Sequence, residues 1–258
     1  MKIYFGQAGS SGLGNLEGIK HSRELNLDAM ELSFTHGIKM LNPLAKQCGK
    51  LAKEKKIKLS VHAPYYINLT SQEKEKITAS KKRILMSCER AHHLGAKYVV
   101  FHGAYYQKQS LEECYNKVAE EIKDLNTTIK KNKWNVKLAP ETTGKASQFG
   151  TVDELMKLKK ETGCHLCIDF AHLFARNLGK IDYNEVFKKL KSLNHIHAHF
   201  SGINYGPKGE RNHTPLNKTF FNPLAKAIKK HKPKSMTIIN ESPNTYPDAV
   251  KMKKWFSQ

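Results

Sequence analysis

The sequence contains no run of about 18 apolar residues, the length that a transmembrane helix requires. Its first residues, Met1 to Gly6, fit a strand better than a signal peptide, so we expect a cytoplasmic protein with no membrane partner. Cysteine is scarce: the five cysteines are an odd number scattered along the chain, which argues against a disulfide framework. Cys164 and Cys167 form a CxxC pair, but no second pair at zinc-finger spacing accompanies it. Core packing is therefore the expected role of this pair.

Acidic residues are also few, because 23 aspartates and glutamates stand against 44 lysines and arginines, a formal net charge of +21. Such a charge favours polyanionic partners, either nucleic acid or an anionic membrane surface. The basic residues spread along the whole chain and form no detachable tail, which favours nucleic acid. The alternative is an adaptation to a salty or hot cytoplasm. The 39% of hydrophobic residues suffice for a core, and 258 residues are typical of one α/β barrel domain, here residues 1–258.

Short β-rich segments alternate with amphipathic, lysine-rich segments that have helical apolar spacing, such as residues 71–94 and 111–132. No low-complexity linker interrupts this alternation. Eight strand–helix units predict a closed parallel (β/α)₈ barrel, the TIM-barrel class. The expected strands are residues 2–6, 29–34, 57–62, 98–102, 136–141, 165–169, 195–200 and 236–241.

The alternative fold is an open doubly wound sheet, which usually has a glycine-rich phosphate-binding turn after its first strand. The segment from Gly6 to Gly14 is rich in glycine, but its glycines stand at positions 6, 9, 12 and 14. No GxGxxG motif fits this spacing, and no GKS or GKT follows it. We therefore expect a flexible loop at the mouth of a barrel.

Metal-ligating residue types stand at or just after the ends of six consecutive expected strands, where barrel enzymes carry their reactive groups. Any one of these residues is ordinarily a hydrogen-bonded core or surface side chain. Crowded together, however, such groups would repel and desolvate one another unless cations held them, so the set favours a multinuclear metal centre. Imidazoles with carboxylates suit zinc, or manganese or iron, better than magnesium or calcium. The residues are His62, His102, Glu141, Asp169, His172, His197, His199 and Glu241.

Glu141 stands in the middle of this strand order, between the His62 and His102 side and the Asp169, His199 and Glu241 side. Two neighbouring metals can activate a water and hold both the attacking and leaving oxygens of a phosphodiester, and they need a bridging carboxylate. We expect Glu141 to be that bridge and to be catalytic. His195 stands at the start of its strand, and we expect it to be structural.

Six blocks around these residues resemble, in order, the motifs of the endonuclease IV family of apurinic/apyrimidinic (AP) endonucleases. The chain resembles a divergent member of that family over nearly its whole length. The blocks are residues 61–69 (VHAPYYINL), 101–103 (FHG), 140–144 (PETTG), 167–172 (CIDFAH), 199–202 (HFSG) and 240–243 (NESP).

The resemblance implies a zinc enzyme with three metals per chain that cuts double-stranded DNA 5′ to an abasic site and leaves a 3′-hydroxyl and a 5′-deoxyribose phosphate. The first metal would be held by His62, His102 and Glu141. The second would be held by Glu141, Asp169, His199 and Glu241, and the third by His172 with ligands from the loop after the seventh strand. Manganese or iron in some of these sites is an alternative to zinc.

The resemblance also implies that the loop of Tyr65 and Tyr66 enters the DNA and holds the abasic sugar out of the duplex, a role that suits aromatic wedges. The alternative is packing over the barrel mouth. Arg211, in the loop after the seventh strand, is a further expected DNA contact. Where the family has a histidine after its first strand this chain has Gln7, which makes Gln7 the expected DNA contact on the first loop.

The family's Asp-Arg-His triplet after the seventh strand appears here as Glu210-Arg211-Asn212-His213, so the third metal's ligands are altered. We expect Glu210 to replace the aspartate and His213 to supply the imidazole that Asn212 cannot supply. The loop would have to shift its register by one residue to do so. The alternative is a two-metal enzyme in which both residues are ordinary surface residues.

Two other classes of function remain. A sugar isomerase or epimerase of the xylose-isomerase type would need only one metal held by Glu141, Asp169, His199 and Glu241. Such an enzyme has no need of His62, His102 and His172 together, nor of so basic a surface. A non-catalytic nucleic-acid-binding module is the third possibility, but it would not require a full ligand set. We expect the protein to act as a monomer.

Overall fold

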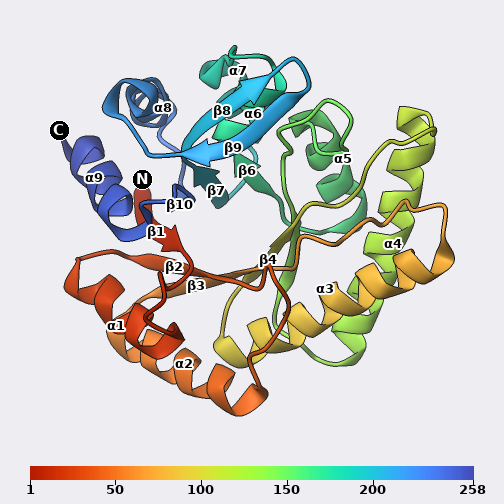
Figure 1. The fold of residues 1–258 in the computed structure, drawn as a ribbon, viewed down its shortest axis with the longest axis horizontal. Helices are drawn as coiled ribbons and strands as arrows, with labels where there is room; N and C mark the ends of the chain where they lie inside the picture. The colour runs from red at the N-terminus through yellow and green to blue at the C-terminus, as the bar shows by residue number, and fades with distance from the viewer.

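The computed structural model describes residues 1–258 and shows eight parallel strands that form a nearly closed barrel with helices around the outside (Figure 1). The predicted TIM-barrel class is confirmed. Around the barrel the strand order is β5-β4-β3-β2-β1-β10-β7-β6. The strands are β1 (Lys2–Ala8), β2 (Ala29–Ser33), β3 (Lys58–His62), β4 (Tyr98–Phe101), β5 (Lys137–Pro140), β6 (Cys167–Asp169), β7 (Ile196–Phe200) and β10 (Ser235–Asn240).

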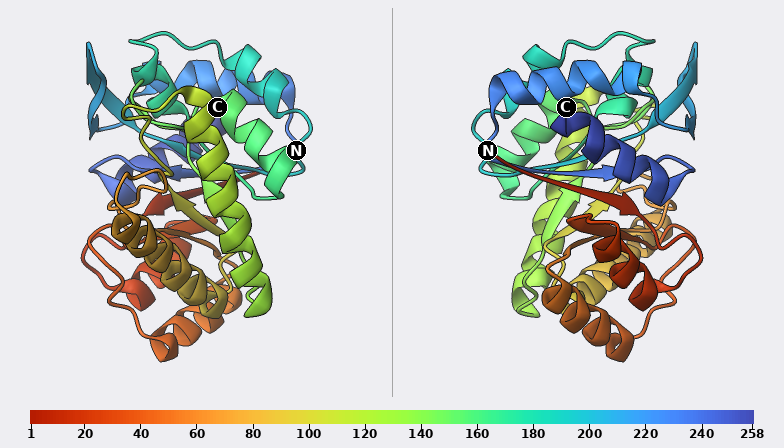
Figure 2. Two further views of the ribbon diagram at one scale, coloured as in Figure 1. Left: turned by 90° about the vertical axis from the view of Figure 1, so that its right-hand side faces the viewer. Right: turned by 90° about the vertical axis from the view of Figure 1, so that its left-hand side faces the viewer.

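The helices follow the strands along the chain and cover the outer face of the barrel (Figure 2). Two of them begin with a complete capping box, in which Ser110 pairs with Glu113 and Thr151 pairs with Glu154. The helices are α1 (Asn15–Glu24), α2 (Asn42–Lys55), α3 (Lys74–Leu94), α4 (Leu111–Lys131), α5 (Val152–Thr162), α6 (Phe170–Arg176), α7 (Tyr183–Leu190), α8 (Lys218–His231) and α9 (Thr245–Ser257). None of them is long and apolar enough to cross a membrane.

The barrel closes at the junction of β5 and β6, which we call the seam. Here the strands share no regular ladder but only the isolated parallel bridge between Glu141 and Cys167. The backbone hydrogen bonds that cross the seam include those from His165 N to Leu138 O at 2.8 Å and from Thr142 N to Cys167 O at 3.0 Å. Glu141, the expected bridging ligand, is therefore also the residue at which the barrel closes.

A two-stranded antiparallel hairpin of β8 (Gly202–Gly206) and β9 (Gly209–Thr214) follows β7 and stands outside the barrel (Figure 1). The sequence analysis expected a loop here. The pairing is irregular, because Asn204 faces Asn212 whereas the next residue, Tyr205, faces Glu210. Arg211 is thus an extra residue, a β-bulge, in β9.

The first loop is shorter than expected, because β1 extends to Ala8 and α1 begins at Asn15. Gly6 lies within β1, where a Cβ atom would collide with the backbone oxygen of Ala29 in β2. Glycine at this position therefore permits the close approach of two strands and does not belong to a phosphate-binding turn. Apolar side chains from strands and helices together form one large core cluster.

Candidate metal centre

The carboxylate of Glu141, only 1% exposed, is surrounded by the imidazoles of four histidines, of which His172 is the most distant at 3.6 Å. Its Oε2 lies 3.3 Å from Nε2 of His62 and 3.0 Å from Nε2 of His102. Its Oε1 lies 2.9 Å from Nδ1 of His199. The two oxygens of one carboxylate therefore face two different sets of possible ligands. This arrangement is the one that the sequence analysis expected of a bridging carboxylate.

The second group of ligand types lies on the Oε1 side of Glu141. Donor atoms of Glu141, Asp169, His199 and Glu241 come within 4.8 Å of one another, and Nδ1 of His199 lies 3.3 Å from Oε1 of Glu241. Asp169 caps α6 by accepting a hydrogen bond from the backbone N of His172 at 2.7 Å. This bond uses only Oδ1, and the buried Oδ2 has no hydrogen-bond partner.

The third group joins α6 to the hairpin. Nε2 of His172 lies 3.1 Å from Nε2 of His213 and 3.5 Å from Oε2 of Glu210. In a regular strand, residues three positions apart point to opposite faces, so Glu210 and His213 would diverge. The bulge at Arg211 brings both side chains to the same face of β9. The structure thus brings Glu210 and His213 to His172, as the sequence analysis expected.

Gly144, in the loop after β5, leaves room for Glu210 because it has no side chain. A Cβ atom on Gly144 would lie 2.6 Å from Cβ of Glu210, and Gly144 O accepts a hydrogen bond from Glu210 N at 2.9 Å. Only glycine leaves room for β9 to dock against this loop.

The orientations of the His172 and His213 rings indicate that a proton or a metal ion belongs between them. Nδ1–H of His172 can donate to Thr142 O at 3.0 Å, and that of His213 to Glu241 O at 3.2 Å. Each ring then presents the lone pair of Nε2, and these two atoms lie 3.1 Å apart. Two facing lone pairs repel unless a proton or a metal ion lies between them. Together with the unpartnered Oδ2 of Asp169, this arrangement fits divalent metals such as zinc.

The charge balance supports the same conclusion. Burial alone would lower the pKa of His62, but the hydrogen bond and the charge of Glu141 raise it to about 9. His172 is likewise buried, and the charges of Asp169 and Glu141 raise its pKa to about 9. Buried carboxylates that attract protons to imidazoles this strongly also attract divalent cations, which replace those protons.

Glu31, on β2, is a functional candidate that the sequence analysis missed. It is fully buried, and its Oε1 and Oε2 lie 3.0 Å from Nε2 of His199 and 3.0 Å from Nε2 of His197, respectively. Ser60 Oγ donates a further hydrogen bond to Oε2 at 2.7 Å. Glu31 therefore contacts the edge of the His199 ring that faces away from Glu141. The only sequence signal was a lone charge in an apolar strand.

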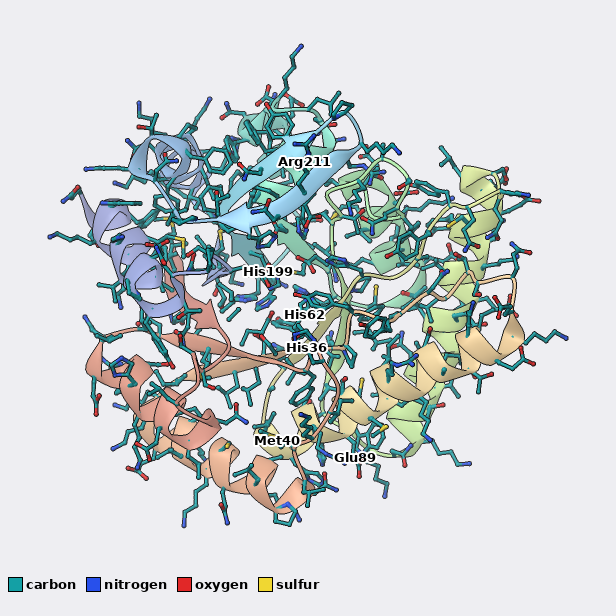
Figure 3. All side chains as sticks on the ribbon, viewed as in Figure 1. His36, Met40, His62, Glu89, His199 and Arg211 are labelled. Atoms are coloured by element: carbon teal, nitrogen blue, oxygen red, sulfur yellow. The ribbon has the colours of Figure 1, made fainter.

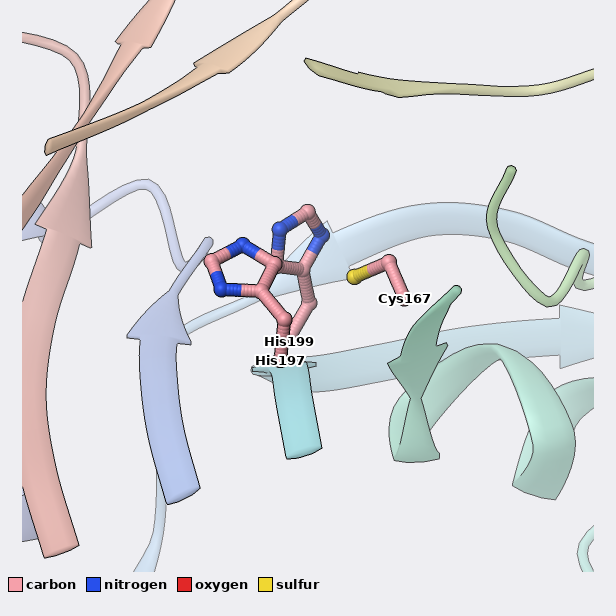
Figure 4. Close-up of side chains that lie close together, drawn as sticks. All are labelled: Cys167, His197 and His199. Carbon is pink, nitrogen blue, oxygen red and sulfur yellow. The ribbon is translucent and has the colours of Figure 1, made fainter. Parts of the chain in front are cut away.

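Cys167 lies on β6 beside His197 and His199 of β7, the side chains drawn together in Figure 4. Burial raises the pKa of this thiol well above its ordinary value. All five cysteines are free and buried. These observations agree with the packing role expected for Cys164 and Cys167. His195 bonds through Nδ1 to Ser235 Oγ at 2.9 Å, away from the metal-ligand groups.

Of the four residues expected to contact DNA, three are exposed and one is buried. Tyr65 is 56% and Tyr66 73% exposed, in the loop that follows β3, and the Tyr65 ring lies beside His62. Arg211 is exposed on the hairpin, whereas His62 and His199 lie near the middle of the barrel (Figure 3). Gln7 is fully buried and bonds to Ser22 Oγ at 3.1 Å. The expectation for Gln7 is corrected, because α1 covers its side chain and a ligand cannot reach it.

Comparison with known proteins identifies a family. Residues 19–256 match the model of the family described as xylose isomerase-like TIM barrel, AP_endonuc_2. An uncharacterized protein of Methanocaldococcus jannaschii is 39% identical, over 99% of this chain and 97% of that protein. A probable endonuclease 4 of Mycoplasma genitalium is 28% identical over 77% of this chain and 74% of that protein.

Solved structures of two functional classes share the fold. Endonuclease IV from Thermus thermophilus superimposes with a TM-score of 0.75 at 18% identity, over 100% of this chain and 99% of that one. D-Psicose 3-epimerase from Clostridium cellulolyticum superimposes with a TM-score of 0.67 at 13% identity, over 100% of this chain and 91% of that one. At these identities the likeness shows the fold alone. The residues at the barrel mouth, and not the fold, distinguish an endonuclease from an epimerase.

Proposed function

Since the chain belongs to the xylose isomerase-like TIM barrel family, we propose that it is a metal-dependent AP endonuclease. It would act as a monomer on double-stranded DNA, cut the backbone 5′ to an abasic site, and leave a 3′-hydroxyl and a 5′-deoxyribose phosphate. The endonuclease 4 relatives support this activity, and so does the endonuclease IV-like set of motifs along the chain.

The observation that carries the proposal is the position of Glu141 between ligand groups. His62 and His102 face one of its oxygens and His199 faces the other, while His172, Glu210 and His213 form a further group beside it. We propose three zinc ions per chain, with manganese or iron as substitutes in some sites. When bound, the metals supply the positive charge that lowers the pKa of a water nucleophile toward about 7 and that stabilises the attacked phosphate.

The chain's own residues then have distinct roles. Glu141 fixes the spacing of the two halves of the site, because one carboxylate serves both. Tyr65, next to His62, and the neighbouring Tyr66 offer exposed aromatic surface that would hold the abasic sugar outside the helix. Arg211 and the many lysines would contact phosphates, which position DNA without reading its sequence.

The second candidate is a sugar epimerase with one divalent metal. Glu141, Asp169, His199 and Glu241 form a group by themselves, and structures of sugar epimerases share the fold. Such an enzyme would leave His62, His102, His172 and His213 without a catalytic task. For this reason we favour the endonuclease.

The test is incision of a duplex that carries one abasic analogue, with and without a chelator. We expect incision that is lost on metal removal and restored by zinc. Glu141→Gln should reduce turnover by orders of magnitude while DNA affinity changes little, because phosphate contacts dominate binding. Glu54→Gln, the same change at an exposed position on α2, is the control. Full activity after verified metal removal, or metal-dependent C3 epimerisation of D-psicose without incision, would contradict the proposal.

A further inference from the structure

A cavity of about 910 Å³ opens at the end of the barrel opposite the candidate metal centre. Its walls come from the first residues of β3, β4, β7 and β10 and from the carboxyl ends of α2 and α3. All strands of a parallel barrel start at the same end, and the metal-ligand groups stand where they finish. DNA bound over the metal centre therefore does not reach this cavity.

The cavity is positively charged and contains no negative side chain. Its 19 lining residues include four lysines and four histidines but no aspartate or glutamate. Two of the lysines, Lys58 and Lys97, lie over the rings of Tyr4 and Tyr98 at 4.4 Å and 5.8 Å. Elsewhere in the protein, lysines such as Lys81, Lys189 and Lys253 form salt bridges with carboxylates. The other two lysines of the cavity are Lys50 and Lys53 on α2.

The carboxyl ends of α2 and α3 contribute negative partial charge, but a helix end carries only about half an elementary charge. The four lysines are exposed to solvent and none of them pairs with a carboxylate, so an anion that enters the cavity would meet unpaired ammonium groups.

We propose that this cavity binds a small anion with two or more phosphate groups. The volume exceeds what a single phosphate fills, and the lysines stand on separate walls, on α2 and at the starts of β3 and β4. Several phosphate groups on one molecule would contact these walls together. The side chains of Tyr98 and Thr237 also line the cavity and offer hydroxyl donors to phosphate oxygens. The site is independent of the proposed endonuclease reaction.

The test is calorimetric titration of the full chain with tripolyphosphate and with ATP, at an ionic strength near the physiological value. Replacing Lys58 and Lys97 together by Gln should weaken binding of either probe by about tenfold or more, since a hydrogen bond to a charged group contributes about 1.5–3 kcal/mol and about 1.4 kcal/mol is tenfold in affinity. The control is the double change Lys117→Gln and Lys226→Gln. It removes the same charge from exposed positions that do not line the cavity.

A second measurement reports the location. The imidazole NMR signals of His195 and His197 should shift with either probe in the wild type and in the control, and not in the Lys58/Lys97 double variant. Tighter binding of ATP than of tripolyphosphate would assign a nucleotide, and equal binding would assign the phosphate chain alone. No binding, equal weakening in the two double variants, or the same imidazole shifts with a DNA duplex would overturn the proposal.

Discussion

Among single residues, Glu31 lies outside the proposed ligand set but contacts one of its members, His199. Metal-ligating histidines usually direct their second nitrogen at a carboxylate or carbonyl, which fixes the ring and makes it a better ligand. His62 and His172 direct theirs at the backbone oxygens of Ala63 and Thr142. His199 instead directs Nε2 at the carboxylate of Glu31, so this one ring has a full negative charge next to its second nitrogen.

We therefore expect Glu31→Gln to lower metal affinity by about 10–100-fold, the usual effect of removing such a partner. The amide keeps the size of the carboxylate but not its charge, so the fold should survive. Competition with a chromophoric chelator measures the affinity, and circular dichroism checks the fold. Glu54→Gln should retain metal as the wild type does. Equal retention by Glu31→Gln would show that Glu31 only fills space.

Glu31 also shows why the site could be predicted only in part. The histidines and carboxylates at strand ends follow from the strand pattern, because every strand of a barrel finishes at the same rim. Glu31 lies inside its strand, and its partner His197 is 166 positions away along the chain. Nothing in the pattern of residues indicates that pairing until the fold brings the two strands together.

At the level of secondary structure, the barrel strands could be predicted to within two residues, because buried parallel strands are nearly continuous apolar runs. The hairpin β8–β9 could not. Its segment Asn204-Tyr205-Gly206-Pro207-Lys208-Gly209 is polar and shows no alternation, since it stands outside the barrel. The shift of register that Glu210 and His213 require was expected, but its physical form, a bulge at Arg211, appears only in the structure.

The hairpin leads to a prediction about metal content. Purified protein should hold about three zinc equivalents per chain, and His213→Ala should hold about two, because His172 and Glu210 without a second imidazole are a poor zinc site. Gly144→Ala should have the same effect, because the added methyl group would displace Glu210. Asn212→Ala, on the same strand but exposed, is the control and should keep all three. Two equivalents in the wild type would refute the third site.

For the whole molecule, the net charge of +21 predicts that DNA, the proposed substrate, binds through electrostatic contacts to its phosphates. Each phosphate that a basic residue neutralises releases counterions, so log K for a DNA duplex should fall by about 0.9 per contact for each unit of log salt concentration. We expect a slope that corresponds to several contacts, measured by fluorescence anisotropy between low and physiological salt. Arg211→Gln should reduce the slope by about one. A slope near zero would instead favour the epimerase.

The seam between β5 and β6 has a consequence for the motions of the molecule. No regular ladder joins the two strands, only the isolated bridge between Glu141 and Cys167, yet Glu141 on one side and Asp169 on the other belong to the same ligand group. Shared ligands would tie the two edges together, so loading zinc should slow local opening there. Amide hydrogen exchange at Thr142 and His165 would then be faster in chelator-treated protein than in zinc-loaded protein, whereas exchange within the regular ladder of β1 and β10 would change little. The break in the ladder of this barrel lies at the candidate metal centre, so the proposed metals would also hold the barrel closed.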